Sequence, residues 1–136
     1  MEETRLLGID FGLKRIGLAL CDPLFTFAYA YKTISNDKNT WVNLSEIINE
    51  NKIKKIILGL PGGEQNKMLI DKILDFKNKI EKKFCVDVIT WNEDYTSAIA
   101  QERIIQSVVK KKKRKEKGLV DQNSAAVILQ EYLDSI

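Results

Sequence analysis

Three carboxylates lie at the ends or beginnings of apolar runs in the sequence, where secondary-structure elements are expected to end or begin. Asp10 ends a short apolar run and is flanked at a distance of two residues by Gly8 and Gly12. Glu93 directly follows the apolar run VDVITW, and Asp121 precedes the last apolar stripe of the chain. Each has an ordinary structural alternative: a strand end for Asp10, a first-turn helix acid for Glu93 and a helix N-cap for Asp121.

The three acids suggest chemistry only if the fold brings them together. Carboxylates that converge repel one another, which raises their pKa values, and a divalent cation relieves that repulsion. A site built from oxygen ligands with open water positions suits Mg²⁺ or Mn²⁺. Two such ions about 4 Å apart can activate water and stabilise the leaving oxygen of a phosphodiester. We therefore expect Asp10, Glu93 and Asp121 to be both metal ligands and catalytic residues.

The 136 residues include no histidine, which limits the kinds of catalytic or metal site that the chain can form. It excludes Ser-His-Asp and Cys-His triads, zinc sites with histidine ligands and any imidazole base. The two cysteines, Cys21 and Cys85, are too few for a structural zinc site and fit a reducing cytoplasm better than a disulfide framework. Carboxylates, lysines, hydroxyls or a hard metal ion must carry any catalysis.

The net charge of +3 is unevenly distributed. The segment 110–117 holds seven bases and one acid, a charge of +6, while the other residues hold 15 bases and 18 acids, a charge of −3. Such asymmetry indicates an anionic partner, most commonly nucleic acid. We expect phosphate contacts from this segment and from two bases just past Asp10. The expected contact residues are Lys14, Arg15, Lys110, Lys111, Lys112, Lys113, Arg114, Lys115 and Lys117.

Apolar periodicity predicts the elements that would position these side chains. Strands are expected at 6–10, 15–22, 27–34, 55–60 and 86–91. Helical stripes are expected to begin near Trp41, Leu69, Ala100 and Ala125. Three strands with short connections, followed by alternating strands and helices, predict an α/β fold. Its mixed five-stranded sheet would be antiparallel in the first three strands, then parallel, with helices on both faces. Trp41 and Trp91 are expected in the core rather than stacked on bases.

The composition, with 44% hydrophobic and 30% charged residues, is that of a globular domain with a real core. The length suits one domain. No apolar run approaches the roughly 20 residues of a membrane helix, and the first residues do not resemble a signal peptide. We therefore expect a cytoplasmic protein without a membrane partner.

Four segments, LGIDFGLKRIGLAL, IILGLP, WNEDYTSAIA and KGLVDQNSAAVILQEYL, carry a resemblance that runs nearly end to end. In this order and spacing the chain resembles the YqgF-type, Holliday-junction-resolvase-like proteins. The resemblance implies one ribonuclease H-like domain over residues 1–136 and a metal-dependent nuclease acting on precursor 16S rRNA. It places the family's acidic triad on Asp10, Glu93 and Asp121. Asp94 stands where the family usually has arginine.

Two other readings remain open at this point. A Holliday-junction DNA resolvase would use the same carboxylates and metal, and it would need a symmetric dimer to cut two strands. A non-catalytic nucleic-acid-binding transcription factor would use the basic segment without metal-stimulated turnover. We expect a monomer or a homodimer whose partner is structured RNA, precursor rRNA or branched DNA.

Overall fold

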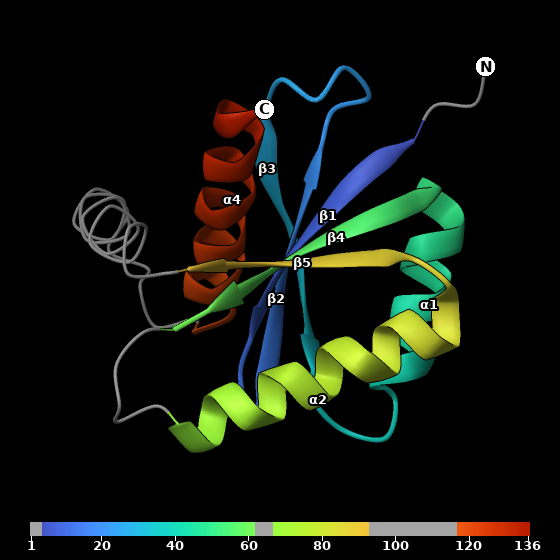
Figure 1. Ribbon diagram of the computed structural model, residues 1–136, viewed down its shortest axis with the longest axis vertical. Helices are drawn as coiled ribbons and strands as arrows, with labels where there is room; N and C mark the ends of the chain where they lie inside the picture. Colours follow the sequence, from blue (N-terminus) through green and yellow to red (C-terminus); the bar gives the residue numbers. More distant parts are fainter. Residues whose placement is uncertain (1–3, 62–66, 93–116) are drawn as a thin grey trace.

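The computed structural model describes residues 4–61, 67–92 and 117–136, with residues 117–122 described by their backbone alone. Five strands and the helices α1, α2 and α4 lie in these segments (Figure 1). Their bounds are β1 Arg5–Phe11, β2 Arg15–Cys21, β3 Ala28–Ser35, α1 Thr40–Asn51, β4 Ile53–Leu60, α2 Lys67–Phe84, β5 Asp87–Asn92 and α4 Lys117–Ser135.

The strands form one twisted five-stranded sheet in the order β3-β2-β1-β4-β5. β2 pairs antiparallel with both β1 and β3, whereas β4 pairs parallel with both β1 and β5. This is the mixed sheet that the sequence predicts. β1 lies at its centre, and the carboxyl ends of β1, β4 and β5 lie at the same edge.

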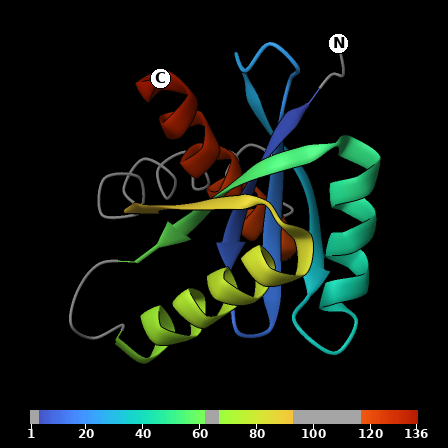
Figure 2. The same ribbon diagram turned by 45° about the vertical axis from the view of Figure 1, so that its right-hand side comes forward.

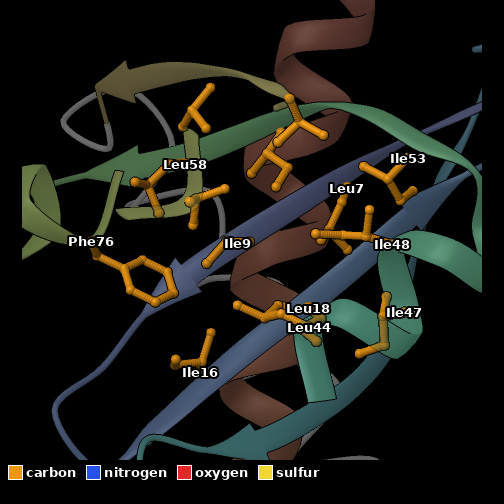
Figure 3. Close-up of a cluster of buried hydrophobic side chains, with 14 of the residues drawn as sticks. Leu7, Ile9, Ile16, Leu18, Leu44, Ile47, Ile48, Ile53, Leu58 and Phe76 are labelled. Carbon is orange, nitrogen blue, oxygen red and sulfur yellow. The ribbon is translucent and has the colours of Figure 1, made fainter. Parts of the chain in front are cut away.

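Helices cover both faces, as expected: α1 and α2 lie on one face and α4 on the other (Figures 1 and 2). On the α1–α2 face, side chains from alternate strand positions pack against the apolar stripes of both helices, as in Figure 3. Leu7 and Ile9 of β1 belong to this cluster and are fully buried. Trp41 packs against Phe76 with ring centroids 5.2 Å apart, which confirms its core position.

A second, smaller cluster fills the space between the sheet and α4. Ala125, Ile128, Leu129 and Leu133 form the buried stripe of α4, as the periodicity predicts. The helix approaches β1 so closely that a Cβ at Gly8 would lie 2.9 Å from the Ala125 carbonyl oxygen and 2.9 Å from the Leu129 Cβ. Only glycine fits this contact without displacing the helix backbone.

Most strand ends differ from the predictions by at most one residue, whereas the beginnings of β4 and α4 differ by more. β4 begins at Ile53 rather than Lys55, because Lys52 takes a left-handed conformation (φ 53°), and its N–H donates to the Ile48 carbonyl. At this single residue the chain leaves α1 and enters β4. α4 begins at Lys117, so Asp121 lies inside the helix and is not its N-cap. The helix expected near Ala100 lies outside the described residues.

Both cysteines are free. Burial raises the pKa of the Cys21 thiol, and the Leu6 N–H donates to its Sγ at 3.1 Å. Cys85 is exposed. Within the described segments, no helix combines the length and the apolar character needed to cross a membrane.

The close contact at Gly8 predicts the effect of a minimal substitution. Gly8→Ala should lower the free energy of unfolding by about 1–3 kcal/mol, because the new methyl group is forced against helix backbone. Urea unfolding measures the change. Val42→Ala, which truncates an exposed side chain of α1, is the control and should change stability by about 0.5 kcal/mol or less. Equal stability of the two variants would contradict the contact.

The different environments of the cysteines predict different thiol reactivity. Cys85 should react with a thiol reagent in the native protein, and Cys21 only on unfolding, because the buried thiol keeps its proton. Cys85→Ser should remove the whole fast phase of labelling, and a remaining fast phase would show that Cys21 is accessible.

The raised pKa of Cys21 also makes the stability of the protein depend on pH. Its contribution to the free energy of unfolding is fully present below the pKa of an exposed thiol and is lost as the pH rises through the pKa of the folded state.

Candidate active site

Asp10 lies near the carboxyl end of the central strand. It pairs with Gly17 of β2 and is half-buried. Side chains alternate along a strand, so Asp10 shares a face with Gly8, while Leu7 and Ile9 point into the cluster under α1 and α2. Gly8 contacts α4. The carboxylate therefore stands on the α4 face of the sheet, at the edge where the parallel strands end.

The contacts of α4 give its direction across this face. Gln130 accepts a hydrogen bond from the Ala28 N–H at 2.8 Å, and Lys55 Nζ donates to the Tyr132 hydroxyl at 3.4 Å. Ala28 and Lys55 lie in the rows of the sheet that cross the start of β1. The end of α4 therefore lies over the amino end of β1, and its beginning extends toward the carboxyl end, as Figure 1 shows.

This direction relates the position of Asp121 to that of Asp10. Asp121 lies one helical turn before Ala125, and Asp10 lies two residues after Gly8, which Ala125 contacts. A helical turn rises about 5.4 Å, and two strand residues span about 6.6 Å. The backbone of α4 thus carries position 121 to the level of Asp10 along β1.

Glu93 lies outside the described residues. Its preceding neighbour, Asn92, ends β5 and pairs with Leu60 at the carboxyl end of β4. β1, β4 and β5 run parallel, so the chain reaches Glu93 from the edge of the sheet that holds Asp10. Trp91 meets Tyr132 edge-on, with ring centroids 5.8 Å apart, and packs in the α4 cluster as expected rather than standing free for base stacking.

The predicted phosphate contacts divide into two groups. Lys14 is exposed and Arg15 half-buried at the connection between β1 and β2, directly after Asp10 and Phe11. Lys117 is the first residue of α4. The six bases from Lys110 to Lys115 lie outside the described residues. Of the three described positions, Lys14 and Arg15 directly follow the carboxyl end of β1.

In the part of the chain with described side chains, no three His, Cys, Asp or Glu residues gather as a metal site would require. That part includes Asp10 but neither Glu93 nor the Asp121 side chain. The prediction that these three acids form a metal site stays a prediction.

A cavity that the sequence does not predict lies on the opposite face of the sheet. Its volume is about 380 Å³, and it opens between the beginning of α1 and the side of α2. Aromatic rings and a mixed rim of carboxylates and lysines line it: Phe11, Asn36, Asp37, Thr40, Trp41, Asp71, Lys72, Asp75, Phe76 and Lys79. In the sequence, Ser35-Asn36-Asp37 suggests only a turn, Phe11 lies at the end of the first strand, and the other lining residues fall in or beside the predicted helices.

A comparison with known protein families shows to which family the chain belongs. The model of the RuvX family, described as Holliday junction resolvase, matches residues 4–135. This chain belongs to the RuvX family. The resemblance found in the sequence motifs is confirmed.

Two RuvX relatives match the chain over nearly its whole length. A protein of Sulfurihydrogenibium sp. is 37% identical, with 98% of this chain and 92% of that protein covered. A protein of Clostridium tetani is also 37% identical, with 97% of each chain covered. Both carry the name "Putative pre-16S rRNA nuclease".

Two solved structures share the fold of this RuvX protein. Thermus thermophilus RuvC in complex with a Holliday junction substrate has a TM-score of 0.65 at 13% identity, covering 97% of this chain and 96% of that one. The fowlpox virus resolvase in complex with Holliday junction DNA has a TM-score of 0.59 at 16% identity, covering 97% and 98%. The predicted ribonuclease H-like fold is therefore confirmed.

Positions 10 and 121 lie at the same height along β1, which predicts that cysteines placed at both positions can be cross-linked. In a Cys85→Ser background, Asp10→Cys and Asp121→Cys should be joined by a short bifunctional thiol reagent, as detected by mass spectrometry. Asp10→Cys with Asn123→Cys is the matched control, because position 123 is turned about 200° around the helix from position 121. Equal bridging of both pairs would contradict the orientation of α4.

Proposed function

We propose that this RuvX protein is a metal-dependent nuclease that processes the 5′ end of precursor 16S rRNA. The observation that carries the proposal is the position of Asp10. It stands at the carboxyl edge of the parallel strands, on the face that α4 reaches with its first turns. Open α/β sheets bind their ligands at this edge, beyond the carboxyl ends of the strands.

The substrate class follows from the relatives. Proteins 37% identical over nearly the whole chain are named for pre-16S rRNA cleavage, which makes ribosome biogenesis the favoured process. The basic residues of this chain suit an RNA backbone, since cationic side chains hold phosphates without reading sequence. A cytoplasmic location goes with such a substrate. One domain spanning residues 1–136 remains part of this proposal.

Asp10, Glu93 and Asp121 are the proposed metal ligands and catalytic residues. Their carboxylate oxygens suit Mg²⁺ or Mn²⁺, and a chain without histidine has no imidazole to favour zinc. When bound, the ions would supply Lewis-acid stabilisation of the phosphate oxygens and a nucleophile at neutral pH.

The other residues of the site hold the substrate. Lys14 and Arg15 are proposed to bind phosphates next to Asp10, from the connection that leaves β1. Lys117, at the beginning of α4, and the bases Lys110–Lys115, which precede it in the sequence, are proposed to bind further phosphates of the backbone. These contacts would orient a phosphodiester across the end of β1, between the two groups of cations.

A second candidate substrate is a four-way DNA junction. It is favoured by the description of the RuvX family and by the resolvase structures that share the fold. A junction resolvase must cut two opposed strands, so this alternative requires a homodimer, whereas rRNA processing is compatible with a monomer.

Replacing Asp10 tests the proposal directly. Asp10→Asn keeps the size of the side chain and removes its charge. Mutating a residue that only supports a metal ligand typically costs 10- to 100-fold, so loss of a ligand should reduce cleavage by more than about 100-fold. The assay measures cleavage of a precursor 16S rRNA fragment and of a four-way DNA junction, in Mg²⁺, Mn²⁺ or chelator.

Asp87→Asn is the matched control. Asp87 is an exposed aspartate at the beginning of β5, the end remote from the proposed site, and its replacement should leave cleavage unchanged. Cleavage of RNA alone would favour rRNA processing, and cleavage of the junction alone would favour the resolvase. Unchanged cleavage by Asp10→Asn, with contaminating nuclease excluded, would refute the catalytic assignment.

A further inference from the structure

The connection between β1 and β2 presents cations close to Asp10. The last pair of the hairpin is Phe11 with Ile16, and Lys14 stands exposed just beyond it. A Cβ at Gly12 would collide with the Arg15 carbonyl oxygen, so the turn closes tightly on itself. A tight turn alone does not set the angle at which the hairpin leaves the sheet, because its tip lies past the last ladder pair.

Asn36 ties this tip to the neighbouring chain. Its side-chain Nδ2 donates to the Gly12 carbonyl oxygen at 2.7 Å, and its backbone N–H donates to the Lys14 carbonyl oxygen at 2.9 Å. These two acceptors lie on either side of Leu13, whose side chain is 59% exposed. One residue therefore holds both arms of the turn, and the side-chain bond is the part that a substitution can remove.

The segment that carries Asn36 is itself fixed to the beginning of α1. Thr40 Oγ1 donates to the Ser35 carbonyl oxygen at 2.9 Å and accepts from the Asp37 N–H at 2.9 Å. Thr40 is 2% exposed and is the buried polar residue of the described core. The hydrogen bonds of a buried hydroxyl are costly to break, so Thr40 holds Ser35 and Asp37, the two neighbours of Asn36, in place.

We propose that Asn36 is a positioning residue that holds the β1–β2 turn, and with it the Lys14 ammonium group, in place for a substrate phosphate. This inference deepens the proposed function and depends on its nucleic-acid substrate, but not on cleavage. Asn36 acts through the hairpin backbone, since both of its bonds end on main-chain oxygens of the turn. The preorganised turn lowers the cost of ordering a lysine on binding.

The experiment measures binding rather than cleavage. A labelled four-way DNA junction and an RNA duplex with a single-stranded 5′ extension are titrated with the full chain in chelator, at several salt concentrations. Asn36→Ala should weaken binding by about two- to tenfold, the worth of one hydrogen bond. The slope of log K against log[salt] should also fall by about 0.7–0.9, the loss of one phosphate contact.

Asn39→Ala is the matched control. Asn39 lies in the same connection and makes no side-chain capping bond, so its replacement should leave affinity and salt slope unchanged. A double-mutant cycle with Lys14→Ala then tests the route of the effect. If Asn36 acts through Lys14, Asn36→Ala should add little to the loss caused by Lys14→Ala alone.

The outcomes separate this inference from the proposed function. Wild-type chain that binds but never cleaves would refute the nuclease and leave the cycle readable. Additive losses in the cycle, or an unchanged salt slope in Asn36→Ala, would overturn the positioning role, because loss of general stability weakens binding without removing a particular contact. Wild-type chain that binds neither probe would overturn both.

Discussion

The geometry of the proposed site depends on the contact between α4 and Gly8. Because a Cβ at this position would lie 2.9 Å from helix backbone, the absence of a side chain sets the distance between helix and sheet. The same contact sets the position of Asp121 relative to Asp10. Asp121 lies one helical turn from Ala125, and Asp10 lies two strand residues from Gly8, both in the direction of the carboxyl edge. A larger residue at position 8 would displace the helix and, with it, position 121 relative to Asp10.

The two faces of the sheet contribute differently to this arrangement. The α1–α2 face contains most of the buried side chains, including Leu7 and Ile9, and it provides the apolar burial that stabilises the fold. The α4 face has a smaller cluster, and Asp10 is not one of its members. An ionised carboxylate would be costly on the first face, and it is tolerated on the second because solvent or a cation can reach it.

The sequence predicted most of the fold, because apolar periodicity reports which face of each element is buried. The stripes of α1, α2 and α4 and the sheet topology follow from it. Boundaries set by single backbone conformations did not: the left-handed conformation of Lys52 starts β4 early, and no residue-type signal announces it. The role of Asn36 was also invisible, because a Ser-Asn-Asp turn does not reveal which carbonyls its side chains reach.

The connectivity of β1 links binding to the proposed chemistry. Asp10 lies at the end of β1, and Lys14 lies in the turn that directly follows this strand, so one hairpin carries both the carboxylate and the proposed phosphate contact. Asn36 and Thr40 tie that hairpin to α1, a helix that packs on the opposite face of the sheet. The core under α1 and α2 thus restrains the hairpin from one face of the sheet, while the Gly8 contact fixes α4 on the other face. A phosphate held between them would meet two rigid supports, which is the preorganisation that metal-assisted hydrolysis requires.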